Sequence, residues 1–310
     1  MAVDATTRAA LVEHARLSIK RGSQSFSAAS QLFDNATRER AWLLYAWCRR
    51  ADDIADNQDM GGVLGDQTDL AERLALIRRL TALAFEGKPT GDPAFDALGV
   101  VAAEVGLTPQ MAEDVIAGFQ LDAEDWRPRT EADMMRYCYH VAGAVGVMMA
   151  VVMGVDPKDQ ETLDRANDLG LAFQLSNIAR DIVEDDAVGR CYLPEIWLVE
   201  QDIEPGQHTK PHHRKELAEM AARLVALVEK HEAAARVGAA KLPFRSRWAV
   251  LSAARIYGAI GRKVRSRGPE AWASRTYVPR GEKALYGVRA FLSAVINREK
   301  MPEGGIHWGI

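Results

Sequence analysis

Two segments of the sequence carry carboxylates at matching positions along a helical repeat. The first reads YAWCRRADDIAD and covers residues 45–56. Its polar side chains fall at offsets 0, 4, 7 and 11, at Tyr45, Arg49, Asp52 and Asp56. At about 100° per residue, these four positions share one narrow stripe of an α-helix. The segment therefore predicts a helix that presents two carboxylates one turn apart.

The second segment repeats this arrangement more than a hundred residues later. It reads QLSNIARDIVEDD and covers residues 174–186. Its polar side chains fall at offsets 0, 3, 7 and 11, at Gln174, Asn177, Asp181 and Asp185. One such pair arises readily by chance, whereas two pairs with matching offsets are harder to dismiss. We therefore expect both segments to serve one site.

The residues around the aspartates indicate burial. Large apolar side chains flank both pairs, at Leu43, Leu44, Trp47, Leu171, Phe173 and Leu175. For either pair alone, a solvated helix face is the simpler interpretation. Two carboxylates about 5 Å apart repel by roughly 3 kcal/mol at an effective dielectric near 20, so a buried cluster of four needs a compensating cation. A metal ion is expected.

The ligand types select the metal and its partner. Carboxylate oxygens favour Mg²⁺ or Mn²⁺ over zinc, and one or two carboxylates per ion leave room for substrate phosphate oxygens. No HExxH spacing occurs, and His208, His212 and His213 fall in a polar loop typical of solvated histidines. The absence of a GxxxxGK[ST] loop and of a GxGxxG fingerprint argues against P-loop nucleotide chemistry and against a nicotinamide cofactor, NAD(P)H included. A diphosphate substrate fits best.

The elements that must position these side chains are helices. Apolar residues recur at helical spacing almost throughout the 310 residues, and alternating β-branched runs are scarce. We predict an all-α protein with one domain over residues 1–310. The expected helices cover residues 5–20, 36–57, 68–86, 94–105, 109–120, 131–154, 159–186, 212–240, 246–267 and 281–297.

Charge and composition limit the partners and the compartment. The net charge of −4 gives no basic footprint for nucleic acid. The three cysteines have no CxxC pairing, which indicates a reducing compartment such as the cytoplasm. The apolar stretch Val141–Val155 is about five residues short of the roughly twenty that span a bilayer. Peripheral membrane contact stays open, and the basic segment Arg262–Arg267 is one candidate for it, with a solvated helix end as the alternative.

Longer motifs give a resemblance to a known family. The chain resembles the squalene/phytoene synthases from about Gly22 to about Lys283, and most closely their bacterial carotenoid-forming members. The motifs that carry the resemblance are GSQSF at 22–26, YAWCRRADDIAD at 45–56, RYCYHVAGAVG at 136–146 and LAFQLSNIARDIVEDDAVGRCYLP at 171–194. It implies an isoprenoid-synthase fold with a central substrate cavity between the two aspartate-bearing helices.

The resemblance also implies roles for individual residues. The metal-binding acids would be Asp52, Asp56, Asp181 and Asp185. The catalytic residues would be Tyr137, Arg49 and Arg180. Further substrate contacts would come from Ser23, Ser25, Tyr45, Val141, Ala142, Gly143, Gln174, Asn177, Tyr192, Tyr257 and Arg275.

Plainer roles exist for several of these side chains. Ser23 and Ser25 could simply cap a helix or form a turn. Tyr137 and Tyr192 could be core tyrosines with satisfied hydroxyl groups. The two arginines next to the acids could form structural salt bridges, although the same geometry suits a diphosphate leaving group.

The activity implied by the resemblance is a prenyl transfer between two identical substrates. Two geranylgeranyl diphosphates would condense head to head (1-1′), through a cyclopropylcarbinyl (prephytoene) diphosphate, to phytoene, the first committed step of carotenoid biosynthesis. The alternative is condensation of two farnesyl diphosphates to a thirty-carbon hydrocarbon. A catalytically inactive homologue that serves as a binding protein is a third reading, disfavoured because all four acids are present. The sequence leaves the oligomeric state open.

Overall fold

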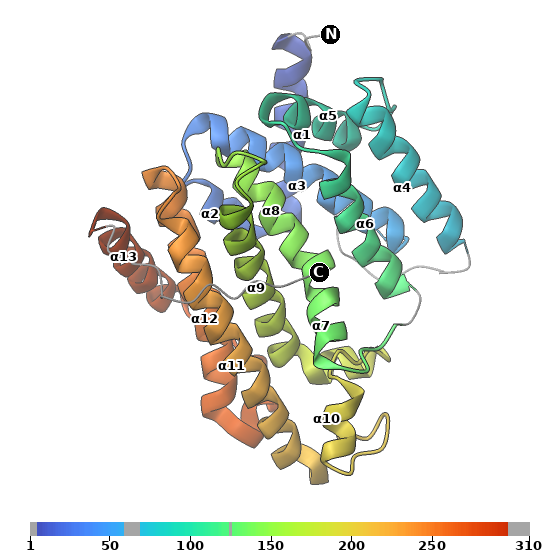
Figure 1. The fold of residues 1–310 in the computed structure, drawn as a ribbon, viewed down its shortest axis with the longest axis vertical. Helices are drawn as coiled ribbons and strands as arrows, with labels where there is room; N and C mark the ends of the chain where they lie inside the picture. Colours follow the sequence, from blue (N-terminus) through green and yellow to red (C-terminus); the bar gives the residue numbers. More distant parts are fainter. Residues whose placement is uncertain (1–4, 59–68, 124–125, 297–310) are drawn as a thin grey trace.

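A computed structural model describes residues 5–58, 69–123 and 126–296, and every regular element in these ranges is a helix (Figure 1). The N-terminal half contains α1 (Ala5–Gly22), α2 (Gln24–Ser30), α3 (Asn35–Ala55), α4 (Leu70–Phe85), α5 (Pro93–Val105), α6 (Pro109–Ala123), α7 (Glu131–Cys138), the π-helical turn η1 (Tyr139–Gly143) and α8 (Ala144–Val152). The C-terminal half contains α9 (Gln160–Ala187), α10 (Glu195–Glu200), the short 3₁₀ turn η2 (Pro211–His213), α11 (Arg214–Ala239), α12 (Phe244–Arg267), the 3₁₀ turn η3 (Gly268–Trp272) and α13 (Arg280–Ile296).

The all-α prediction is confirmed, and most of the predicted helix ranges agree with the structure within a few residues. The short helices α2 and α10 are the ones that the sequence pattern did not indicate, because six or seven residues carry too little periodicity. The predicted helix over 131–154 is present but contains the wide turn η1. The division into domains stays a prediction.

The helix that carries the first aspartate pair belongs to one hydrophobic core. Asp34 caps the start of α3, where its Oδ1 accepts the Thr37 backbone N–H at 3.0 Å. Buried side chains such as Leu43, Leu44 and Trp47 then pack α3 against α1 and α5. Because one face of the helix is committed to this core, its polar stripe must face elsewhere.

The helix that carries the second pair belongs to a second core. Asp159 caps α9 by accepting the Thr162 backbone N–H at 3.2 Å. In Figure 1 α9 runs through the middle of the bundle, and it packs on α11, α12 and α8. Leu171, Leu175 and Ile178 join the core beneath it. The aspartate-bearing part of α9 is thus anchored in a different core from α3, whereas Leu163 near the start of α9 belongs to the first core.

Gly170 permits close packing between α9 and the wide turn η1. A Cβ added to Gly170 would lie 2.4 Å from the Ala142 carbonyl oxygen and 2.7 Å from the Gly143 Cα. Both neighbours are backbone atoms, so they cannot move aside without shifting the turn that follows Tyr137.

We expect Gly170→Ala to lower the free energy of unfolding by about 1–3 kcal/mol, the usual cost of overpacking. Gly287→Ala is the matched control, because the added Cβ meets nothing within 4 Å in the middle of α13. The control should raise stability by up to about 1 kcal/mol through helix propensity. Urea unfolding measures both changes, and equal stability of the two variants would contradict the packing argument.

One continuous helical stretch of the described chain is long and apolar enough to cross a membrane. It runs over Glu131–Val152, with a mean hydropathy of 1.3 over its most apolar window. The stretch is longer than Val141–Val155 because the helix begins at the Thr130 capping box. It packs against α9 and α6 inside the bundle, and 44% of the window is buried there. A core helix passes the same length test, so this is weak support for insertion.

Candidate functional site

The first aspartate pair lies beside the half-buried Arg49 and near Tyr45. Arg49 Nη1 donates to Asp52 Oδ2 at 2.7 Å. Burial raises the pKa of Asp52 to about 6, although Arg49 opposes this shift. Burial also raises the pKa of Asp56. The buried hydroxyl group of Tyr45 has no hydrogen-bond partner among the described residues, so the stripe retains an unsatisfied polar atom.

The second pair lies beside two arginines. Arg180 contacts Asp181 with both Nε and Nη2, the former at 2.8 Å. Arg275 Nη2 approaches Asp181 Oδ1 at 2.9 Å. Burial, followed by the neighbouring Asp181 charge, raises the pKa of Asp185 to about 7. Both pairs thus consist of an arginine-bound aspartate and a second aspartate one turn further along the helix.

Arg190 connects the two pairs electrostatically. It lies just beyond the end of α9, where its backbone N–H donates to the Asp185 carbonyl oxygen at 2.9 Å. Its positive charge lowers the pKa of Asp56 on α3 and also that of Asp185 on α9, against the effect of burial. One aspartate of each predicted pair therefore lies within the electrostatic influence of the same cation.

A buried carboxylate on α6 joins the predicted tyrosines. Tyr137 donates to Asp122 Oδ1 at 2.8 Å, and Tyr192 donates to the same oxygen at 3.2 Å. The two rings stack with their centroids 4.8 Å apart, and Trp126 stacks on the far side of Tyr137 at 5.5 Å. Burial raises the pKa of Asp122, while the Tyr137 hydroxyl and the Arg190 charge oppose the shift. The hydroxyl groups of Tyr137 and Tyr192 are satisfied by a residue that also faces the aspartates.

Sequence reasoning missed Asp122 and Arg190. A signal for Asp122 was present, because it is an acid between the apolar residues Phe119, Leu121 and Trp126. Arg190 directly follows the second aspartate motif and precedes Tyr192 by two residues. Neither residue has the repeated spacing that revealed the aspartate pairs.

The remaining predicted contacts on α9 and α12 lie close to the second pair. Gln174 and Asn177 are half-buried on α9, one to two turns before Asp181. Tyr257 on α12 stacks on Phe173 with ring centroids 4.0 Å apart. Burial raises the pKa of Tyr257, whereas the Arg180 charge lowers it, so this phenol lies near the same arginine that binds Asp181.

The serine segment reaches the site through a neighbouring aromatic ring. Phe26 on α2 packs against Tyr45, with ring centroids 5.7 Å apart. Ser23 caps α2, because its hydroxyl oxygen accepts the Phe26 backbone N–H at 3.2 Å. The capping role is therefore realised for Ser23, next to the site. The side chain of Ser25 lies outside the described residues.

The residues predicted to line a tail tunnel lie in or beside η1. A Cβ on Gly118 of α6 would lie 3.0 Å from Val141, and one on Gly170 would meet Ala142. A Cβ on Gly143 would meet Asn167. These positions mediate close helix contacts, and their role as tunnel lining stays a prediction.

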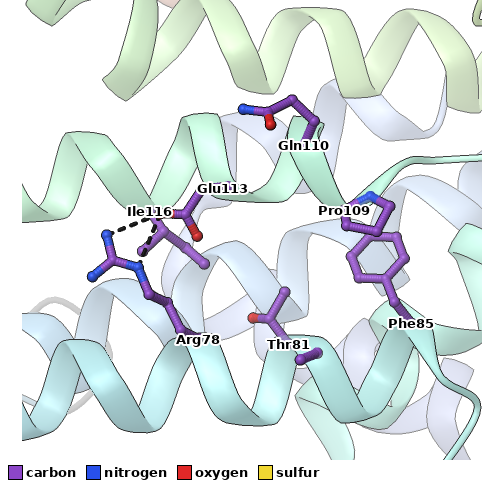
Figure 2. Close-up of a pocket in the computed structure, with 8 residues that line it drawn as sticks. Arg78, Thr81, Phe85, Pro109, Gln110, Glu113 and Ile116 are labelled. Carbon is purple, nitrogen blue, oxygen red and sulfur yellow. Dashed lines mark hydrogen bonds and ion pairs between the residues drawn. The ribbon is translucent and has the colours of Figure 1, made fainter.

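Recesses on the described surface include two that differ in their relation to the site. One of about 200 Å³ lies between α4 and α6, where Arg78 and Glu113 pair at 2.9 Å above Thr81 and Phe85 (Figure 2). No predicted site residue lines it. The other is a crevice too narrow for a water molecule, and its walls include Asp185, Arg190, Tyr192 and Ile178. The second recess therefore marks the site side of the bundle, and the predicted cavity for substrate tails stays a prediction.

The donor set fits Mg²⁺ or Mn²⁺. Within residues 5–58, 69–123 and 126–296, no three acidic, histidine or cysteine side chains converge closely enough to hold an ion by themselves. Magnesium usually takes one or two carboxylates and completes its octahedron with water and phosphate oxygens. Two half-buried aspartate pairs on separate helices, each with no more than two carboxylates, are compatible with this requirement. Asp52, Asp56, Asp181 and Asp185 are the side chains that would hold the ions.

Comparisons with known proteins agree with this geometry. The family model described as squalene/phytoene synthase matches residues 19–282. A phytoene synthase of Pseudescherichia vulneris is 46% identical over 275 residues, which cover 88% of each chain. A 15-cis-phytoene synthase of Enterobacter agglomerans is 45% identical over 282 residues, covering 89% of this chain and 94% of the other.

Solved structures share the fold. A dehydrosqualene synthase superimposes with a TM-score of 0.78 at 25% identity, over 92% of this chain and 96% of that chain. A squalene synthase from Alicyclobacillus acidocaldarius superimposes with a TM-score of 0.76 at 23% identity, over 86% of this chain and 97% of that chain. With paired aspartates on two helices and a family match over most of its length, the chain belongs to the squalene/phytoene synthase family.

Proposed function

We propose that the protein is a prenyltransferase of the 15-cis-phytoene synthase type. It condenses two geranylgeranyl diphosphates head to head (1-1′), through prephytoene diphosphate, to phytoene, the committed step of carotenoid biosynthesis. Relatives that are 42–46% identical over most of the chain are named phytoene synthases. The dehydrosqualene and squalene synthase structures are 25% identical or less, so they support the fold more than the thirty-carbon alternative.

The observation that carries the proposal is that two aspartate pairs, one on α3 and one on α9, each hold an arginine, and that the charge of Arg190 acts on both Asp56 and Asp185. Aspartates on a single helix would suit one metal-bound phosphate group. Aspartates on two helices suit two diphosphate groups. Arg49 and Arg180 lie against Asp52 and Asp181, respectively, within a hydrogen-bond length. On binding of substrate these guanidinium groups are available to the phosphate oxygens, because the carboxylates gain a metal ion instead.

The metal, once bound, would neutralise the negative charge that develops on the departing diphosphate. The protein's own residues supply the rest of the environment. Arg49, Arg180 and Arg190 would stabilise the same charge, and Tyr45 would donate its unpartnered hydroxyl to a phosphate oxygen. The stacked aromatic group of Trp126, Tyr137 and Tyr192 would border the allylic cation and exclude water.

Two protons must leave during the reaction, and Tyr137 is a poor acceptor for either. Two C20H33 groups lose two diphosphates and two protons to give C40H64, so no reductant is consumed. Burial and the Asp122 charge raise the pKa of Tyr137, and its O–H is committed to Asp122. Tyr137 therefore stays protonated, and the released diphosphate is the better base. The role of Asp122 is to hold the phenol in place.

We assign the protein to the cytoplasm with peripheral contact to a membrane, because both the substrate tails and the product are lipophilic.

A product assay tests the proposed reaction. Purified protein with Mg²⁺ and geranylgeranyl diphosphate, dispersed in detergent without any nicotinamide, should release a forty-carbon hydrocarbon of phytoene mass.

The parallel reaction with farnesyl diphosphate tests chain length. Each unburied methylene-sized group costs about 0.8 kcal/mol, so a tail that is five carbons shorter should react more slowly by a factor that reflects a few kcal/mol. Faster formation of a thirty-carbon product would overturn the substrate assignment but keep the reaction class. Absence of hydrocarbon from both substrates would contradict the proposed function altogether.

A further inference from the structure

The C-terminal helix α13 carries a long apolar face that no described element covers. Its opposite side is fixed to α12 through the buried residues Ala290 and Ala294. Two polar contacts support this attachment, since Trp248 Nε1 donates to the Gly287 carbonyl oxygen at 2.8 Å and Arg247 Nη1 donates to that of Ala294 at 3.1 Å. In Figure 1 α13 lies at the edge of the bundle, outside α12. One side of the helix is thus held firmly while the other is open.

The open side is dominated by large hydrophobic side chains. Among the described residues twelve large hydrophobic side chains are exposed, and six of them belong to this one helix, with exposed fractions between 39% and 58%. We call them the α13 face: Leu285, Val288, Phe291, Leu292, Val295 and Ile296. Exposed Phe244, at the start of α12, extends the face through an edge contact with Phe291 at 5.6 Å. A contiguous patch of this kind marks a binding surface.

The charge of α13 is opposite to that of the whole chain. The helix carries Arg280, Lys283 and Arg289 but only one acid, Glu282, so its net charge is +2 in a chain of net charge −4. Glu282 is itself paired with Lys263 of α12 at 2.9 Å. Basic side chains therefore flank the apolar face. This arrangement fits a partner that carries negative charge at its surface and is apolar beneath it.

The segment Arg262–Arg267, which the sequence suggested as a membrane contact, does not offer such charges. Arg262 pairs with Glu232 at 2.6 Å, and Arg265 binds both carboxylate oxygens of Glu229 at 2.7 and 2.9 Å. Arg267 donates to the Ser274 carbonyl oxygen and to Thr276. These cations are already paired or bound within the protein, so α13 is the better candidate for a membrane contact, and the contact at Arg262–Arg267 stays a prediction.

We propose that the α13 face docks on an anionic phospholipid surface. A helix of 17 residues is about 26 Å long and can lie flat, with its apolar side chains at the acyl boundary and the exposed Arg280 and Arg289 among the headgroups. A second copy of the chain is a poorer occupant, because a two-fold contact would bring the same basic helix against itself. The membrane contact forms part of the proposed function, on which this assignment of a surface rests.

Docking here would bring the membrane close to the predicted site. Tyr286, on the packed side of α13, belongs to the same apolar cluster as Tyr257 of α12. Tyr257 in turn stacks on Phe173 of α9, one residue before Gln174. The apolar cluster that contains Tyr286 and Tyr257, followed by the Tyr257–Phe173 stack, therefore connects α13 to the α9 helix. Substrate tails and product would exchange with the bilayer on this side.

Vesicle flotation tests the surface with the full-length protein. The vesicles contain equal parts of phosphatidylglycerol and phosphatidylcholine, at low salt, and phosphatidylcholine alone serves as the neutral comparison. Wild-type protein should float with the anionic vesicles, and the double variant Val288→Glu, Leu292→Glu should float at least about tenfold less. The matched control is Leu17→Glu, Val199→Glu, which alters two equally exposed apolar residues elsewhere and should float like wild type.

Each result decides the matter. Equal flotation of the two double variants, or no flotation of wild type, would overturn the proposal. A dimer in sedimentation velocity that the α13 double variant abolishes would assign the face to a second copy instead. Turnover of detergent-dispersed geranylgeranyl diphosphate tests the proposed reaction independently of membrane docking. The α13 double variant should keep wild-type turnover in this assay. If wild type floats but forms no hydrocarbon in detergent, the reaction fails while the docking surface stands.

Discussion

Turnover is expected to fall by about a thousandfold or more in Asp185→Asn, while the helical fold is kept. The substitution removes one metal-binding oxygen, and loss of several kcal/mol of charge stabilisation corresponds to about three powers of ten in rate. The variant should also unfold at the same or a higher temperature in metal-free buffer, because the amide avoids the cost of a buried carboxylate. Release of diphosphate at saturating Mg²⁺ measures the rate, and circular dichroism measures the melting.

Asp164→Asn is the matched control for this change. Asp164 lies on the same helix and makes a hydrogen bond with Gln160, but its side chain is exposed and distant in sequence from the stripe. Its turnover should be unchanged. If Asp185→Asn melts like wild type and turns over at a similar rate, Asp185 does not belong to the site.

A second large effect is expected for Arg190→Gln, whose kcat should fall by about 10²–10³-fold. Loss of one preorganised donor at a site of developing negative charge has this magnitude. Arg190 is the charge that both aspartate pairs share, so its removal should affect ionisation of either diphosphate. Steady-state kinetics with geranylgeranyl diphosphate and single-turnover formation of prephytoene diphosphate measure the two ionisations.

The control for Arg190 must separate charge from loop structure. Arg127 Nη2 donates to the Gly189 carbonyl oxygen at 3.2 Å, so Arg127→Gln loosens the same loop without removing the shared cation. It should lose far less activity than Arg190→Gln. Arg190→Lys should recover part of the activity that Arg190→Gln loses. Lysine keeps the positive charge, but its ammonium group lacks the planar set of donors of a guanidinium group. If Arg127→Gln and Arg190→Gln were equally slow, the effect would be structural.

The aspartate pairs could be predicted from sequence because their geometry is local. Residues four apart on a helix share a face whatever the rest of the chain does, so Asp52 and Asp56 needed no tertiary information. Arg49 followed for the same reason, whereas the role of Arg180, directly before Asp181, came from the family resemblance. Helix existence was likewise encoded in apolar spacing that covers most of the chain.

Residues that reach the site through tertiary packing could not be found this way. Asp122 meets Tyr192 across 70 positions of sequence, and no spacing rule connects them. The ion pairs of Arg262–Arg267 could not be predicted for a similar reason. Its partners Glu229 and Glu232 lie a full helix earlier, so the sequence showed a run of positive charges where the structure has ion pairs.

The wide turn η1 has a consequence for how the helix beneath the tyrosines can vary. Each extra residue in a helix rotates everything beyond it by about 100°, and a π turn accommodates such a residue without ending the helix. Tyr137 lies before η1 and meets Asp122, whereas Met148 lies after it and packs into the other core. The turn thus changes the direction in which side chains point after it, relative to those before it, within one continuous helix. The turn therefore allows Tyr137 to face Asp122 and the site while Met148, on the same continuous helix, faces the hydrophobic core.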